Sequence, residues 1–209
     1  MHSNLKRLII IDIRVNELKT SLFVLIFCFI IPFIFSINPN SMIQAAMPGE
    51  LLMPLVAIFC FGSLFLPEQT ANIISVINSK TRQLQTIYII RFIWYMILLI
   101  LVNSGIILTY SLSSTQYNLL LLWFDFCVKS FFIGSMIILI YSLSRAIAAS
   151  YLIPTLYFAL CIGYPHLGMM TLLTIMHRQG WSGNWLQFCL GTLFLLMGFV
   201  ILKYQPAKA

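Results

Sequence analysis

Residues 65–92 read FLPEQTANIISVINSKTRQLQTIYIIRF. This stretch is the longest polar interruption in an otherwise almost continuously apolar chain, and it contains Glu68, Lys80, Arg82 and Arg91. An apolar chain keeps such a segment where water or a soluble partner can reach it, because burying an unpaired charge is costly. The stretch therefore predicts a polar connection between two membrane helices.

The composition of the chain predicts an all-α membrane protein. Of the 209 residues, 61% are hydrophobic and only 8% are charged, whereas soluble domains carry about 25% charged residues. A hydrocarbon core of ~30 Å needs roughly 20 apolar residues per helical crossing, so the chain has room for about six crossings. A nucleotide-binding fold does not fit beside them, and the string G-x-x-x-x-G-K-[ST] is absent. We therefore expect no cofactor in this chain.

The apolar segments place the expected crossings. They predict transmembrane helices at about 21–37, 51–66, 87–110, 119–143, 147–161 and 186–202. Residues 163–185 have an apolar middle of only about ten residues, which favours an external re-entrant or interfacial piece. Residues 1–20 mix apolar and charged side chains, which is typical of an amphipathic interfacial lead-in helix; the alternative is a cytoplasmic extension of the first crossing. Residues 21–209 then form one six-span domain.

The basic residues predict the orientation of these crossings. The formal charge is +7, and all twelve Lys and Arg except Lys129 and Arg178 fall into groups at alternate ends of the apolar segments. Cytoplasmic loops carry such an excess of basic residues, so we expect both termini and the 67–82 connection inside the cell. The loops at 38–50 and 111–118 would then be external. This distribution favours a multi-pass plasma-membrane protein over a nucleic-acid-binding one.

The connection itself is expected to be a short helix lying across the membrane surface. Pro67 suits a first helical position, and the carboxylate of Glu68 would face the positive end of the helix dipole. With Lys80, Arg82 and Arg91, it would offer a soluble motor protein a rigid polar handle for charge-assisted contacts. The alternative is an ordinary solvated loop.

The arrangement resembles the permease subunits of type-2 ATP-binding-cassette (ABC) exporters. The resemblance is carried by the amphipathic lead-in, the six spans and the broken apolar segment before the last span. Locally it is carried by Glu68, the turn Ser79-Lys80-Thr81-Arg82 and then Arg91. It implies a cytoplasmic coupling helix that docks a separate cytosolic ABC ATPase, which would bind the ATP and magnesium. It also implies a second permease subunit, identical or similar, and the small size is similar to peptide-exporting and bacteriocin-immunity permeases.

Asp125 and Lys129 are a second candidate site. Their spacing of four residues puts them on one face of a helix, and ionisable groups inside a membrane usually face the bundle interior or water. They are either a proton relay or substrate gate, or a mutually satisfied pair near the external interface.

The remaining motifs do not indicate catalysis or metal binding. The five cysteines are scattered singly without a Cys-x-x-Cys pair, and neither H-E-x-x-H nor G-x-S-x-G occurs. His166 and His177 are isolated loop residues, although small haem-exporter subunits share the broad layout. We therefore expect a non-enzymatic export subunit for an amphipathic peptide, drug or lipid-like cargo. The alternatives are a stand-alone immunity or binding protein, an ion-coupled carrier using Asp125, and a haem-exporter-like subunit.

Overall fold

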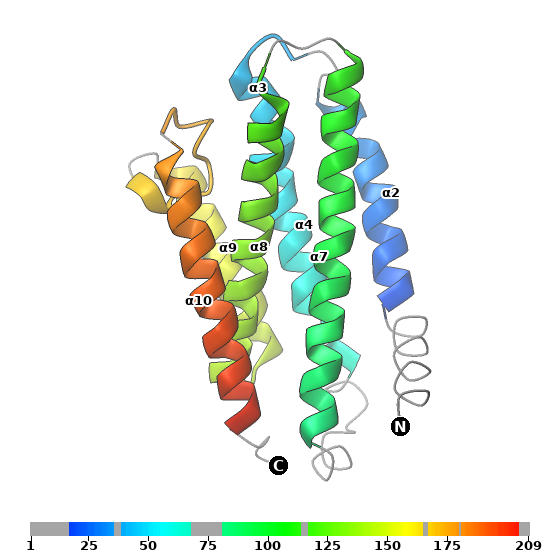
Figure 1. Cartoon of the computed structure of the whole chain (residues 1–209), viewed down its shortest axis with the longest axis vertical. Coiled ribbons are helices and arrows are strands. Elements are labelled where there is room, and N and C mark those ends of the chain that lie inside the picture. The colour runs from blue at the N-terminus through cyan, green and yellow to red at the C-terminus, as the bar shows by residue number, and fades with distance from the viewer. Residues whose placement is uncertain are drawn as a thin grey trace.

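The computed structural model describes residues 17–35, 39–67, 81–113, 117–164, 167–179 and 181–204, and within them every regular element is helical. Six helices run along the long axis (Figure 1): α2 (Leu18–Ile34), α4 (Met53–Ser63), α7 (Thr81–Leu112), α8 (Leu119–Ser144), α9 (Ile147–Gly163) and α10 (Ser182–Tyr204). Three short elements complete the described part: α3 (Met42–Met47), the π-helix η2 (Pro48–Leu52) and the 3-10 turn η4 (Gly168–Met170).

Four helical stretches are long and apolar enough to cross a membrane: Met42–Ser63, Gln85–Leu112, Leu119–Ser144 and Ser182–Tyr204. The first of these is continuous through α3, η2 and α4. Helices α2 and α9 are also apolar but have 17 residues each. At 1.5 Å per residue α7 is about 48 Å long, so it exceeds a hydrocarbon core of ~30 Å.

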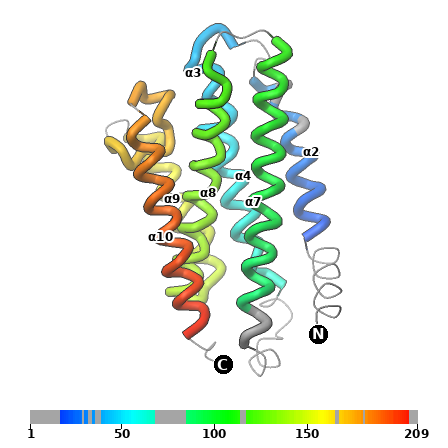
Figure 2. The backbone as a smooth tube through the Cα atoms, viewed as in Figure 1, coloured from blue at the N-terminus to red at the C-terminus, as the bar shows by residue number. Residues whose placement is uncertain are grey.

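The helices alternate in direction between two ends of the molecule (Figure 2). The starts of α2, α7 and α9 and the ends of α4, α8 and α10 lie at the end drawn at the bottom, which we call the lower end. The opposite, upper end holds α3 and the connection between α9 and α10. The end of α4 and the start of α7, which flank residues 68–80, therefore lie at the same end as the start of α2 and the end of α10.

Helix α8 lies at the centre of the bundle and packs against α4, α7, α9 and α10. Its contact with α10 is close because α10 presents Gly191 and Gly198 to it. A Cβ atom at Gly198 would lie 2.8 Å from Ile138 Cγ2 and 3.2 Å from the backbone nitrogen of Leu139. Small residues at such positions let two membrane helices approach closely, and this packing holds the start of α10 beside α8.

One predicted loop is a helix in the structure. Residues 38–50 were expected to form an external loop, but residues 42–52 are helical and continue into α4. Ser41 is the N-cap, because its hydroxyl accepts a hydrogen bond from the Gln44 backbone N–H at 3.2 Å, as serine commonly does at this position. Polar Gln44 and Glu50 resemble loop residues in the sequence, yet Glu50 is buried.

The other boundaries differ by a few residues. The lead-in was expected to reach residue 20, whereas α2 begins at Leu18, and α9 continues to Gly163. Residues 167–179 contain the 3-10 turn and further turns. Residues 1–16 and 68–80, on which the lead-in and most of the coupling helix were predicted, lie outside the described residues.

Candidate functional site

Of the four residues predicted to couple to an ATPase, the structure describes two, and both belong to α7. Glu68 and Lys80 lie outside the described residues. Arg82 belongs to the first turn of α7, which begins at Thr81. Arg91 lies further along α7, and only 1% of its surface is exposed. The guanidinium of Arg91, which was expected to be part of a polar handle for a soluble motor protein, is therefore inside the protein.

Arg91 belongs to a buried polar group that we call the lower brace: Glu17, Ser63, Leu64, Arg91 and Tyr95. Arg91 Nη1 donates a hydrogen bond to the Leu64 carbonyl at 2.7 Å, and Arg91 Nε lies 3.3 Å from Glu17 Oε1. The Tyr95 hydroxyl donates to Glu17 Oε2, and Ser63 Oγ lies 3.1 Å from that hydroxyl. The brace joins three segments: the residue before α2, the end of α4 and the first half of α7.

The lower brace is an electrostatic as well as a mechanical connection. Glu17 and Arg91 are each 1% exposed, so neither charge is well hydrated. Removing one partner of such a pair leaves an uncompensated buried charge, which is strongly destabilising. Because α4 and α7 flank the connection at 68–80, the brace links the two flanking helices to each other.

Asp125 and Lys129 lie in a second buried group near the upper end. Lys129 Nζ donates to Asp125 Oδ2 at 2.5 Å, as the four-residue spacing allows. The ammonium group also donates to Glu50 Oε1 at 2.6 Å. All three side chains are fully buried. The pair that the sequence indicates is therefore a triad, with Glu50 supplied from η2.

Thr174 and Asn184 complete this group, which we call the upper cluster: Glu50, Asp125, Lys129, Thr174 and Asn184. Lys129 Nζ donates to Thr174 Oγ1 at 2.9 Å, and Asn184 Nδ2 donates to Asp125 Oδ1 at 2.7 Å. Thr174 Oγ1 lies 3.1 Å from Glu50 Oε1 and 3.0 Å from Asp125 Oδ1, so its single proton can go to either. With both carboxylates ionised the cluster has one more negative than positive charge.

Glu50 also holds the backbone of the connection between α9 and α10. The Ile175 N–H donates to Glu50 Oε1 at 2.7 Å, and the Met176 N–H donates to Glu50 Oε2 at 2.9 Å. Hydrogen bonds with an ionised acceptor are roughly twice as strong as neutral ones. A side chain more than one hundred positions earlier in the chain therefore fixes this connection.

The π-helix η2 explains how Glu50 reaches the interior. Pro54 has no N–H to donate to the Glu50 carbonyl four residues earlier, and its ring clashes with that carbonyl. The backbone instead widens by one residue, and the Met53 N–H bonds to the Pro48 carbonyl. Gly49 makes room, because a Cβ there would lie 1.9 Å from the Phe126 ring. Single π turns occur often at functional sites.

Sequence reasoning missed Glu17, Glu50, Tyr95, Thr174 and Asn184. One signal was present: the chain has only five acidic residues, and a carboxylate in an apolar segment needs a partner. Glu17, Glu50 and Asp125 are the three acidic residues in the described ranges, and each is buried beside a basic side chain. Thr174 and Asn184 give no comparable signal, since such residues are common in loops.

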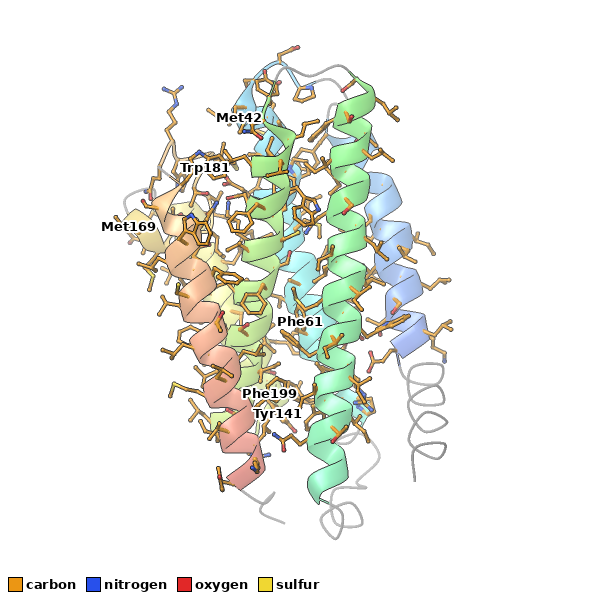
Figure 3. All side chains as sticks on the ribbon, in the orientation of Figure 1. Met42, Phe61, Tyr141, Met169, Trp181 and Phe199 are labelled. Atoms are coloured by element: carbon orange, nitrogen blue, oxygen red, sulfur yellow. The ribbon has the colours of Figure 1, made fainter. Side chains whose placement is uncertain are left out.

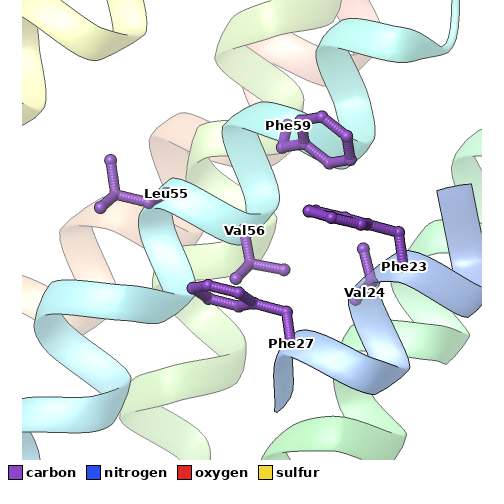
Figure 4. A pocket seen from close by; sticks show the side chains of 6 residues that line it. All are labelled: Phe23, Val24, Phe27, Leu55, Val56 and Phe59. Atoms are coloured by element: carbon purple, nitrogen blue, oxygen red, sulfur yellow. The ribbon is translucent and has the colours of Figure 1, made fainter. Parts of the chain in front are cut away.

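An apolar groove of about 190 Å³ lies between α2 and α4. Figure 4 shows the six side chains that line it: Phe23, Val24 and Phe27 from α2, and Leu55, Val56 and Phe59 from α4. The rings of Phe23 and Phe59 are 5.3 Å apart. Its lining has neither charged nor hydrogen-bonding side chains, so the groove suits hydrocarbon and does not suit a polar ligand.

Neither buried group resembles a metal site. Among the described residues, no three or more His, Cys, Asp or Glu side chains are grouped so that they could hold a metal ion. The side chains that surround both groups are mostly apolar, as Figure 3 shows for the bundle as a whole. Comparison of the chain with protein-family models, with curated proteins and with solved structures yields no match to any of them.

Proposed function

We propose that the chain is the membrane-spanning subunit of an ATP-driven exporter in the plasma membrane. It would pair with a second permease subunit, identical or similar, and dock a separate cytosolic ABC ATPase at residues 68–82. The cargo would be amphipathic: a peptide, a drug or a lipid-like molecule. In this proposal all six long-axis helices cross the membrane, and α2 and α9 cross despite having 17 residues each.

The distribution of charge supports this orientation. Lys19, Arg145 and Lys203 all lie near the lower end, at the start of α2, after the end of α8 and in the last turn of α10. Segment 68–80 is bounded at that same end by α4 and α7. An excess of basic residues marks the cytoplasmic side, so the lower end is the side where an ATPase would dock.

The lower brace is the observation that carries the proposal. A docking segment transmits force only when the helices on either side of it move with it. Arg91 lies on α7. Its guanidinium contacts both the Leu64 carbonyl, just after α4, and Glu17, just before α2. A push on 68–80 would therefore move α2, α4 and α7 as one body. An ordinary solvated loop has no need of a buried ion pair at its base.

The expected cycle follows from this rigid unit. ATP binding would bring two ATPase subunits together and press on segment 68–82 of each permease subunit. The braced helices would then shift relative to α8, α9 and α10, and the contacts of α8 with α4 and α7 would be the sliding surface. Cargo would leave between the subunits toward the outer leaflet. Glu68, Lys80 and Arg82 would contact the ATPase, and Arg91 would hold the brace.

The test is a double substitution, Glu68→Ala with Arg82→Ala, in the chain expressed with its native membrane partners. We expect the variant to insert normally but to lose a co-purifying ATPase and its cargo export. Lys203→Ala is the matched control, because it removes an exposed positive charge at the same end of the molecule. Retention of the ATPase and of export by the double variant would refute the docking role of 68–82.

The upper cluster favours a second candidate, an ion-coupled carrier that uses Asp125. The observation that favours a carrier is the excess of one carboxylate, since Glu50 and Asp125 share a single ammonium group. Buried ionisable groups of this kind often belong to proton or ion pathways. Activity of such a carrier would survive deletion of every ABC ATPase, and Asp125→Asn would impair it more than Glu68→Ala. The exporter predicts the opposite order.

A further inference from the structure

The connection between α9 and α10 contains a segment that four other elements hold in place. We call residues 171–179 the upper strap. Thr171, Leu172, Leu173 and Thr174 are buried although no helix longer than a turn forms there. Glu50 of η2 accepts both the Ile175 and Met176 backbone N–H groups. The strap is thus part of the interior and not a loose surface loop.

The other attachments come from α8, α9 and α10. The Thr174 hydroxyl lies between Glu50 and Asp125, the latter on α8. Gln187 Nε2 of α10 donates to the Thr171 carbonyl at 2.6 Å. The Tyr157 hydroxyl of α9 donates to the Met170 carbonyl just before the strap. The strap therefore ties the upper ends of η2, α8, α9 and α10 to one another.

Two features, one in the strap and one in the α10 side chain that holds it, are unfavourable in this arrangement. Arg178 has φ of +54°, a left-handed conformation that non-glycine residues adopt only at an energetic cost. Gln187 Oε1 is buried and has no hydrogen-bond partner among the described residues, which also costs free energy. Detaching the strap would relieve both, because the backbone could relax and the amide oxygen could meet water.

The polar attachments of the strap depend on few side chains. Apolar packing of Leu172 and Leu173 also holds the strap, but two of its polar attachments meet at one carboxylate, which accepts two amide protons. Glu50 in turn is held by Lys129. A change at this carboxylate or its counter-ion would release the two backbone N–H groups together, since one side chain accepts both.

We propose that the upper strap is a releasable gate, which Glu50 holds closed by accepting the Ile175 and Met176 amide protons. When it is closed, η2, α8, α9 and α10 cannot separate at the upper end. Release would let these ends part and would let water reach the upper cluster. The gate rests on the proposed exporter in one respect only: the exporter proposal makes the upper end the side where cargo leaves.

The experiment measures how fast a cysteine at Met176 reacts with a membrane-impermeant maleimide. The full chain carries Met176→Cys in a background whose five native cysteines are replaced by serine or alanine. We expect Glu50→Gln, which keeps the size of the side chain but removes its charge, to raise the labelling rate at least tenfold. Leu120→Cys, at the exposed start of α8, is the reference site and should label at one rate with or without Glu50→Gln.

Two further variants separate gate release from general loosening. Thr174→Val removes the strap's own hydroxyl from the cluster and should raise the rate in the same direction. Ser135→Ala removes a buried hydroxyl of α8 that donates to the Phe131 carbonyl of its own helix, and it should leave the rate unchanged. Parental labelling rates in both Glu50→Gln and Thr174→Val would overturn the gate.

The same reporter distinguishes the gate from the exporter. In proteoliposomes containing the permease with its ATPase, ATP hydrolysis should raise labelling at position 176 in the otherwise parental chain. A rise with Glu50→Gln but none with ATP would support the releasable strap and contradict its use in an ATP-driven cycle. Labelling that requires reagent on the cytoplasmic side would contradict the proposed orientation while leaving the strap itself supported.

Discussion

Replacing Lys129 with methionine tests whether the upper cluster is dry and whether its one ammonium group stabilises both carboxylates. The substitution keeps an unbranched side chain one atom shorter than lysine and removes the ammonium group that lies 2.6 Å from Glu50 and 2.5 Å from Asp125. Breaking a buried ion pair by removing one partner costs about 3–5 kcal/mol, because the remaining charge is uncompensated. Here two carboxylates would be left facing each other, so we expect the upper part of this range.

The loss can be followed in detergent with a dye that fluoresces on reacting with thiols. Cys60 and Cys161 are fully buried, so they react only when the packing of the helices opens. For chains of 150–250 residues each kcal/mol moves Tm by roughly 2–4 °C, so a loss of about 4–5 kcal/mol should lower the Tm of Lys129→Met by roughly 8–20 °C. Lys203→Met, at an exposed lysine, should stay within about 0.5 kcal/mol of the parent.

The triple variant Glu50→Gln, Asp125→Asn, Lys129→Met is the internal control. Replacing a whole buried ion group by neutral residues of similar shape is often neutral or stabilising, so the triple variant should regain more than half of the lost stability. A single variant Lys129→Met that melts within 2 °C of the parent, about 1 kcal/mol or less, would refute the reasoning. It would mean that water reaches the two carboxylates.

Two further predictions use the same thermal assay. Arg91→Met should cost about 3–5 kcal/mol, and adding Glu17→Gln should recover part of that loss, since the carboxylate then no longer lacks a cation; an additive double variant would contradict the pairing. Gly49→Ala should cost about 1–3 kcal/mol by overpacking against Phe126, whose ring would lie 1.9 Å from the new Cβ. Gly105→Ala is its matched control, because no atom lies within 4 Å there, and it should gain about 0.5–1 kcal/mol; equal shifts at the two glycines would show that the close approach at Gly49 is absent.

Much of the helical layout could be predicted from the sequence, because long apolar segments fold into helices whatever lies around them. The stretches 119–143 and 186–202 correspond to α8 and α10 within a few residues. The contact between Asp125 and Lys129 follows from helical geometry alone. The helix positions and this contact depend only on residues that are close together in the sequence, so they could be predicted.

The buried polar groups could not be predicted, because their partners are far apart in the sequence. Glu50 pairs with Lys129 across 79 positions, and its placement depends on a π turn that arises from Pro54 and Gly49. Arg91 looks like a residue at the membrane boundary until Glu17 is found beside it. In both groups the decisive information is which carboxylate lies near which cation, and an isolated sequence does not contain it.

The burial of Glu17, Glu50 and Asp125 has a consequence for how the protein interacts with lipid. Within the described residues the surface carries lysine and arginine but no exposed carboxylate. At this described part of the surface, anionic phospholipid headgroups are attracted to the basic side chains, and salt weakens that attraction because exposed charges are screened. The internal pairs are screened far less, so a high-salt wash should remove bound acidic lipids while the two buried groups keep the helices together.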